Sequence, residues 1–341
     1  MPLEHNKAKR LIVHIGLGKT GTTTLQTHLF PDLTKNKGFL YNPKEFLAIA
    51  SKKYNYSEQD KLEFLTLCNS FDILISAENI VGWNPRNWTN AADKAVDLFS
   101  KSAIVVITVR DSHEYMRSRY CQLIQEGNII SPEDFFVDSA TYEKLTPFIA
   151  PLSLLRFDHQ KFDLHFLKKL YQERFEDVYI LPLTRLDSLY PWKKLFNMSN
   201  TEIKFFKNKI KSSPHENRSF SALALRLTIL RERFLNLFGV RTIGSSDILL
   251  SRAVSKRENG KIPFRNLSLY LKLRELPKRI LQILAKSQLL NWRWWMQRVL
   301  DRVVPYKKYN LPLENVKFDP SLMEANKRLI QESEYFIDKT K

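Results

Sequence analysis

The sequence predicts an α/β fold in which a doubly wound parallel sheet with helices on both faces is joined to a helical, basic C-terminal region. Four short apolar runs have the pattern of buried parallel strands, at residues 11–15, 71–76, 103–109 and 178–183. Helical patterns alternate with these runs along the chain, as in doubly wound sheets. With 341 residues, 43% of them hydrophobic, the chain can bury a full core. We expect an α/β core over residues 1–240 and a mostly helical, basic extension over 241–341, packed on that core.

The helices between these runs have recognisable ends. The first helix runs through residues 23–30, where Pro31 is expected to end it, and a loop follows over residues 36–42. Helical periodicity continues over residues 43–68, 159–175 and 221–238. Asp319 and Pro320 form a good N-cap and N1 pair, so we expect a last helix that ends near Asp338.

Composition excludes several classes of protein. Fifty-four Lys and Arg against 36 Asp and Glu give a net charge of +18, which predicts an anionic partner. The apolar runs fall short of the ~20 residues that span a bilayer, and the N-terminal run, interrupted by His14 and Lys19, does not fit a signal peptide. Two cysteines without metal-ligand spacing predict neither disulfides nor a metal site. We therefore expect a cytoplasmic protein.

A glycine-rich loop after the first strand predicts an anion site. Residues 16–24 read GLGKTGTTT, so backbone N–H groups, a helix start and threonine hydroxyls come together there. A nucleotide-triphosphatase loop has lysine directly after its last glycine, whereas here that place belongs to Thr22 and the lysine is Lys19. The anion would therefore meet the ammonium group at the bend of the loop.

A second anion-binding pattern follows the strand at residues 103–109. That strand ends in Arg110, and a helical pattern continues through Gln125. Ser118 follows Arg110 by eight residues, so it lies one to two turns into the helix and can point back towards the arginine. The fork of an arginine side chain suits a dianionic phosphate.

Together the two patterns resemble sulfotransferases, which transfer a sulfuryl group from 3′-phosphoadenosine 5′-phosphosulfate. The resemblance covers roughly residues 10–240. It implies that the 5′-phosphosulfate is held by residues of the glycine-rich loop, namely Gly18, Lys19, Thr20, Gly21, Thr22 and Thr23. It also implies that Arg110 and Ser118, with Tyr120 after them, hold the 3′-phosphate. Lys19 would stabilise charge on the leaving group, and no metal would be needed.

Glu78 is the candidate catalytic base. It comes just after the strand at residues 71–76, and the carboxyl ends of parallel strands meet at the ligand crevice. A partly buried carboxylate there could take the proton of an acceptor hydroxyl. The alternative is that Glu78 caps the next turn or pairs with Lys19 or Arg110. In the following loop, Trp83 and Trp88 could form a platform for a sugar ring or simply fix the loop to the core.

Residues 251–310 contain 15 Lys and Arg but only three acidic residues. Apolar and basic residues alternate at near-helical spacing, and Trp292 and two further tryptophans follow. This pattern is typical of a helix at an anionic membrane surface. The alternatives are a solvated helix packed on the main domain and a site for a polyanionic glycan. Two weaker motifs, residues 217–219 and the basic turn 255–261, also resemble late sulfotransferase segments.

These observations lead to one main hypothesis about function and two alternatives. The main hypothesis is a sulfotransferase that acts on a hydroxyl of a glycan or glycolipid, either free in the cytoplasm or peripheral on the inner face of the membrane. Without a predicted membrane anchor, the chain resembles bacterial carbohydrate sulfotransferases more than the anchored Golgi enzymes. The alternatives are a Mg-ATP phosphotransferase with Asp111 as metal ligand, and a non-catalytic basic protein that binds membrane surfaces. Nucleic acid is not expected, because no nucleic-acid-binding signature accompanies the charge.

Overall fold

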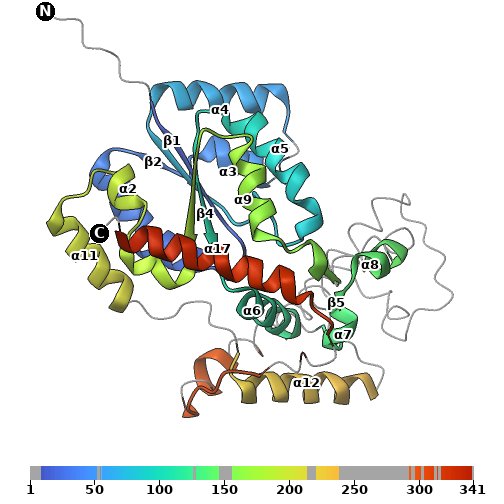
Figure 1. The fold of residues 1–341 in the computed structure, drawn as a ribbon. Helices are drawn as coiled ribbons and strands as arrows, with labels where there is room; N and C mark the ends of the chain where they lie inside the picture. Colours follow the sequence, from blue (N-terminus) through green and yellow to red (C-terminus); the bar gives the residue numbers. More distant parts are fainter. Residues whose placement is uncertain are drawn as a thin grey trace, which may run out of the picture. The chain divides into compact units, whose positions relative to one another are not determined.

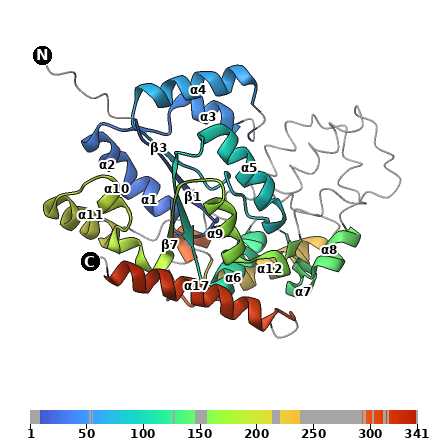
Figure 2. The ribbon, with the colours of Figure 1, turned by 45° about the horizontal axis from the view of Figure 1, so that its top comes forward.

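The structure is a computed structural model (Figures 1 and 2). Its contacts divide the chain into two units. It describes residues 9–51, 54, 56–125, 128–145, 156–212, 220–237, 292, 296–300, 303–310, 313 and 316–339. The first unit comprises Met1–Tyr115, Lys161–Asn217 and Asp319–Lys341, and the second comprises Met116–Gln160 and Arg218–Phe318. The domain boundary expected at residue 240 stays a prediction.

The first unit contains a five-stranded parallel sheet in the order β2-β3-β1-β4-β7, which confirms the α/β fold class. The strands are β1 (Leu11–Gly16), β2 (Leu40–Tyr41), β3 (Ile73–Ser76), β4 (Ile104–Val109) and β7 (Asp177–Pro182). In the central strand, Val13 lies opposite Ile75 of β3 and Val105 of β4. The carboxyl ends of these three strands therefore meet at one edge of the sheet, where the chain reverses its direction of winding.

Helices cover both faces of this sheet. Those of the first unit are α1 (Thr22–His28), α2 (Phe30–Lys37), α3 (Lys44–Ser51), α4 (Glu58–Ser70), α5 (Trp88–Phe99), α9 (Leu164–Gln172), α10 (Trp192–Leu195), α11 (Asn200–Ser212) and α17 (Pro320–Lys339). Three 3₁₀ turns, η1 (Pro85–Asn87), η3 (His159–Lys161) and η4 (Leu183–Ser188), join them, and η3 crosses the boundary between the units. Helix α6 (Ser112–Gln125) begins in the first unit and continues into the second.

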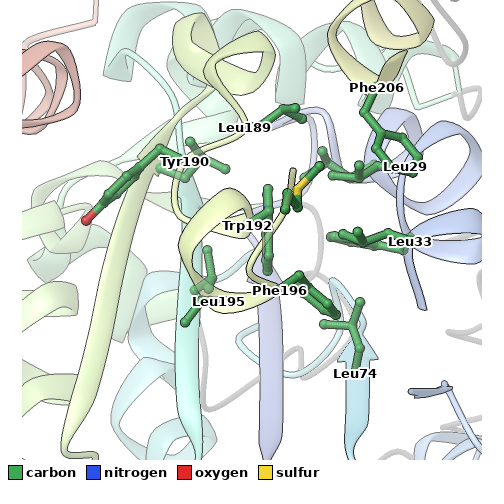
Figure 3. Packing of buried hydrophobic residues seen from close by; sticks show 14 of the residues in the cluster. Leu29, Leu33, Leu74, Leu189, Tyr190, Trp192, Leu195, Phe196 and Phe206 are labelled. Carbon is green, nitrogen blue, oxygen red and sulfur yellow. The ribbon is translucent and has the colours of Figure 1, made fainter. Parts of the chain in front are cut away.

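One face of the sheet is closed by a cluster that includes residues from α1, α2, α10 and α11 (Figure 3). Trp192 and Phe30 are fully buried there, and their rings meet edge to face. Truncation of a core aromatic of this size costs about 3 to 5 kcal/mol. On the opposite side, Phe46, Phe64 and Phe99 bring α3, α4 and α5 together.

Helix α17 belongs to the first unit although it is far away in sequence. Asn326 in its middle is fully buried. The side-chain amide donates to the hydroxyl of Ser112 at 3.0 Å and to the carbonyl of Phe162 at 2.7 Å. Its oxygen accepts from the N–H of Leu164 at 2.7 Å. The last helix is thereby fixed to the beginnings of α6 and α9, and its expected start at Pro320 is confirmed.

Two expectations about local structure were wrong. Pro31 does not end a helix but lies in the first turn of α2, because a proline has no N–H and the first turn needs none. The loop expected over residues 36–42 contains β2, whose two residues pair with β3. A strand of two residues is too short to produce an apolar run in the sequence.

The second unit is described in part. It contains α7 (Pro132–Phe135), β5 (Phe136–Val137), α8 (Ser139–Leu145), β6 (Phe157–Asp158), α12 (Ala222–Leu237) and the π-helical turn Met296–Leu300. Trp292 donates its indole N–H to the hydroxyl of Thr228 at 3.0 Å, and the guanidinium of Arg231 covers its ring. These contacts give Trp292 a packing role within the unit.

Candidate functional site

The loop between β1 and α1, residues 17–21, is called the Lys19 loop. Lys19 has φ 71° and Gly21 has φ 82°, so two residues of this short loop are left-handed. Such a conformation costs a residue with a side chain about 1 to 2 kcal/mol. The bend is therefore held by its surroundings, and Lys19 lies at the bend as the sequence predicts.

Three threonine hydroxyls surround Gly16 at the base of the Lys19 loop. A Cβ atom on Gly16 would lie 2.1 Å from Oγ1 of Thr22, 2.9 Å from Oγ1 of Thr108 and 3.1 Å from Oγ1 of Thr20. Because all three threonines are almost fully buried, no side chain fits at this position. The first glycine is thus required by close packing under the loop.

Gly21 is needed both for its backbone conformation and for the lack of a side chain. A Cβ there would lie 2.4 Å from Cδ1 of Leu186 and 2.8 Å from Cδ1 of Leu183. We expect Gly21→Ala to lower the free energy of unfolding by about 2 to 4 kcal/mol, from left-handed strain and overpacking together. Urea denaturation would measure this change.

Gly38 is the matched control for that substitution. It has φ 71° but nothing within 4 Å of its missing Cβ, so Gly38→Ala should cost only about 1 kcal/mol, the backbone part of the penalty. Equal losses for the two variants would contradict the packing argument.

Arg110 brings the second motif into contact with the first. Its Nη1 donates to the carbonyl oxygen of Lys19 at 3.2 Å, and its Nη2 lies 3.0 Å from a carboxylate oxygen of Glu114. The side chain is 21% exposed. The guanidinium of Arg110 is thus attached to the backbone of Lys19. Both residues lie at the carboxyl edge of the sheet.

Glu78 lies beside the Lys19 loop. Its Oε2 is 3.8 Å from where a Cβ of Gly18 would be, which is ordinary van der Waals contact. The expected partial burial of Glu78 is wrong, because the residue is exposed in the turn that leaves β3. The carboxylate is therefore open to an incoming molecule.

The remaining predicted donor-binding residues are placed differently from one another. Thr22 is buried and Thr23 half-buried on the first turn of α1. Ser118 lies in the second unit and is buried at 4% exposure, and its role stays a prediction. The hydroxyl of Tyr120, from the same motif, donates to the carbonyl of Ile130 at 2.6 Å.

A buried polar cluster below this edge was missed by the sequence analysis. Nδ1 of His14 lies 2.8 Å from the hydroxyl of Ser76, which also accepts from the amide of Gln26 at 3.1 Å. Asn42 exchanges two hydrogen bonds with the backbone of Ser76. A histidine in the middle of an otherwise apolar strand was the signal. The cluster joins β1, β3 and α1 under the Lys19 loop.

Burial lowers the pKa of His14 from 6.5 to about 3. The unfolded chain therefore binds an additional proton below pH 6.5, so stability is complete above that value and is lost as pH falls towards 3. Between pH 6.5 and 5 we expect a loss of about 2 kcal/mol from this residue. His14→Asn should remove most of that slope, as measured by urea titrations at several pH values. A slope as steep as that of the wild type would assign the effect to other groups.

Trp88 does not form a sugar platform. It is fully buried and its ring packs against Phe162, so it anchors the start of α5, whereas Trp83 is half-buried. Asp111 caps α6, because its Oδ1 accepts the N–H of Glu114 at 3.0 Å. No group of three or more metal-ligating side chains occurs among the described residues.

The basic stretch at residues 251–310 lies largely outside the residues that the structure describes. Residues 217–219, the turn 255–261 and most of 251–310 lie outside the described residues. None of the helices in the described part of the chain has both the length and the apolar composition for crossing a membrane.

Comparison with known proteins finds a remote likeness among solved structures. No protein-family model matches the chain, and no curated protein matches it. Among solved structures, the chain is similar to a sulfotransferase from Alicyclobacillus acidocaldarius, with 16% sequence identity and a TM-score of 0.37. The similarity covers 74% of this chain and 97% of that one.

Proposed function

We propose that this protein is a sulfotransferase that moves a sulfuryl group from 3′-phosphoadenosine 5′-phosphosulfate to a hydroxyl group. The observation that carries the proposal is the hydrogen bond from Arg110 to the carbonyl of Lys19. It joins the two sequence motifs that resemble the 5′- and 3′-phosphate sites of that family. A donor with phosphate groups at both the 5′ and the 3′ position of its ribose needs two cationic sites at one edge of the sheet.

The residues of the Lys19 loop fit such a donor. The hydroxyl of Thr22 is buried and has no hydrogen-bond partner among the described residues. Buried hydroxyls are almost always satisfied, and rotation about χ1, which threonine tolerates in a helix, would offer this one to a phosphate at the bend. The N–H groups of residues 18–23 and the Lys19 ammonium would complete the 5′ site, and Arg110 and Ser118 would hold the 3′-phosphate.

The chemistry needs charge stabilisation and a proton acceptor. As the acceptor oxygen bonds to sulfur, the bond from sulfur to the bridging oxygen breaks and its electron pair stays on the 5′-phosphate. Lys19 would stabilise that charge. Glu78, exposed beside Gly18, would take the proton of the acceptor hydroxyl. None of these steps requires a metal.

The acceptor is proposed from resemblance and charge. A hydroxyl of a glycan or glycolipid is the acceptor that the resemblance to bacterial carbohydrate sulfotransferases implies. The +12 balance of residues 251–310 supports an anionic membrane surface as a further partner. Under this proposal the protein acts in the cytoplasm, either free or peripheral at the inner face of the membrane.

One assay separates this function from a Mg-ATP phosphotransferase. Adenosine 3′,5′-bisphosphate should raise the melting temperature without magnesium, and labelled sulfate should pass from the donor to members of a glycan and glycolipid panel. ATP with magnesium should give neither protection nor transfer. Protection and transfer with ATP and magnesium alone would favour the phosphotransferase. The metal ligand which that alternative needs is Asp111, and its Oδ1 caps α6 instead. Lipid binding without any transfer would favour a non-catalytic protein.

Arg110→Lys tests the 3′-phosphate site. Lysine keeps the charge but loses the fork, so we expect the Kd for adenosine 3′,5′-bisphosphate to rise about tenfold or more. Arg174→Lys is the control, because Arg174 has the same 21% side-chain exposure and a similar ion pair, with Asp93. Titration calorimetry should detect the change in the first variant only.

A further inference from the structure

Thr108 is a buried polar residue that no sequence motif includes. It lies in β4, two residues before Arg110, and is 0% exposed. Its Oγ1 lies 2.8 Å from Oγ1 of Thr20, and its carbonyl oxygen is 3.4 Å from the backbone nitrogen of Leu17. The strand that supplies Arg110 therefore also contacts the Lys19 loop from below.

The hydrogen bonds among these groups have a fixed direction. A threonine hydroxyl has one hydrogen, and Thr20 donates its hydrogen to the carbonyl oxygen of Leu17 at 2.5 Å. The hydrogen in the contact between the two threonines must therefore come from Thr108. The result is a chain that runs from Thr108 to Thr20 and on to Leu17. It leaves the hydroxyl of Thr20 with no hydrogen for a phosphate.

We infer that Thr108 is a positioning residue for Lys19. The hydroxyl chain fixes Thr20 and Leu17, which flank Gly18 and Lys19, and so holds the left-handed bend that presents the ammonium group. This inference rests on the proposed function and deepens it: Thr20 contributes its backbone N–H to the donor site, while its side chain belongs to the support beneath the loop. Arg110, the residue after β4, makes a second contact with the loop through its hydrogen bond to the carbonyl of Lys19.

If Thr108 had only a structural role, its loss would act through the stability of the whole fold. Thr34 is the control residue for that possibility. The residue is 2% exposed, and its hydroxyl donates to the carbonyl of Phe30 at 2.6 Å, inside α2. Thr34→Val and Thr108→Val each remove one buried hydroxyl with almost no change in shape. Only the second removes a contact to the Lys19 loop.

The experiment measures amide hydrogen exchange in the loop and the affinity for adenosine 3′,5′-bisphosphate. For Thr108→Val we expect exchange at residues 18–21 to accelerate about tenfold and the Kd to rise about tenfold, the net value of one hydrogen bond. Thr108→Ser should restore both, and Thr34→Val should change neither. Wild-type exchange in Thr108→Val, or faster loop exchange in Thr34→Val as well, would overturn the inference.

A second variant, and exchange measured without the donor, separate a failure of this inference from a failure of the proposed function. Thr20→Val removes both hydrogen bonds of the same chain, so the double variant should exchange no faster than Thr20→Val alone, and additive effects would count against a single chain. Exchange in the free protein tests the positioning role without any donor. Failure of the wild-type protein to bind the bisphosphate would instead remove the proposed function.

Discussion

Alanine in place of Lys19 is expected to slow sulfuryl transfer by about 10²- to 10³-fold and to leave the fold intact. The ammonium group would face charge that develops on the 5′-phosphate only as the bond to sulfur breaks, and loss of one such stabilising group usually costs about 3 to 4 kcal/mol in the transition state. The measurement is kcat at saturating donor, with thermal unfolding as the check on folding. Lys35→Ala, at an exposed lysine of α2, should behave like the wild type.

Lys19→Gly makes the same test sharper. Lys19 has φ 71°, a conformation that glycine adopts freely, so the glycine variant should be as stable as the alanine variant or up to about 1 kcal/mol more stable. Activity and stability would then move in opposite directions. A glycine variant with the wild-type rate would mean that the lysine side chain takes no part in the reaction.

Glutamine in place of Glu78 is expected to reduce kcat by about 10²- to 10⁴-fold, the usual contribution of a positioned general base. The amide has almost the same shape but cannot accept the acceptor's proton. Affinity for adenosine 3′,5′-bisphosphate should stay unchanged, because Glu78 takes no part in the proposed phosphate sites. Single-turnover transfer with a bound donor would separate this effect from binding.

The control for Glu78 is another exposed carboxylate. Glu58→Gln, in the first turn of α4, changes the charge of the protein by the same amount at a residue that belongs to none of the proposed sites. If both variants lose equal activity, the effect comes from net charge. If Glu78→Gln keeps the wild-type rate, another group must accept the proton.

Much of the fold could be predicted because buried parallel strands produce continuous apolar runs. The runs that contain Val13, Val105 and Ile180 became β1, β4 and β7 with ends shifted by few residues. The start of α17 was predictable from Asp319, whose carboxylate accepts the N–H of Ser321. Local signals of this kind depend only on neighbours in the chain.

The rest depends on contacts between distant residues. No local pattern indicates that Thr108 meets Thr20 across 88 positions, or that Trp88 is covered by Phe162. The exposure of Glu78 follows from the path of the turn after β3, which the residue types leave open. The rule that adjacent parallel strands end at one edge indicates that Lys19 and Arg110 lie near each other, but the hydrogen bond between them could not be predicted.

The position of Asn326 has a consequence for how the protein is made. The three groups that it bonds, in Ser112, Phe162 and Leu164, are all synthesised more than 160 residues earlier. A growing chain on the ribosome therefore carries the glycine-rich bend and its arginine long before the amide that locks the neighbouring helices. The anchoring of α6 and α9 by Asn326 is therefore complete only after α17 has emerged, later than the synthesis of every residue of the proposed donor site.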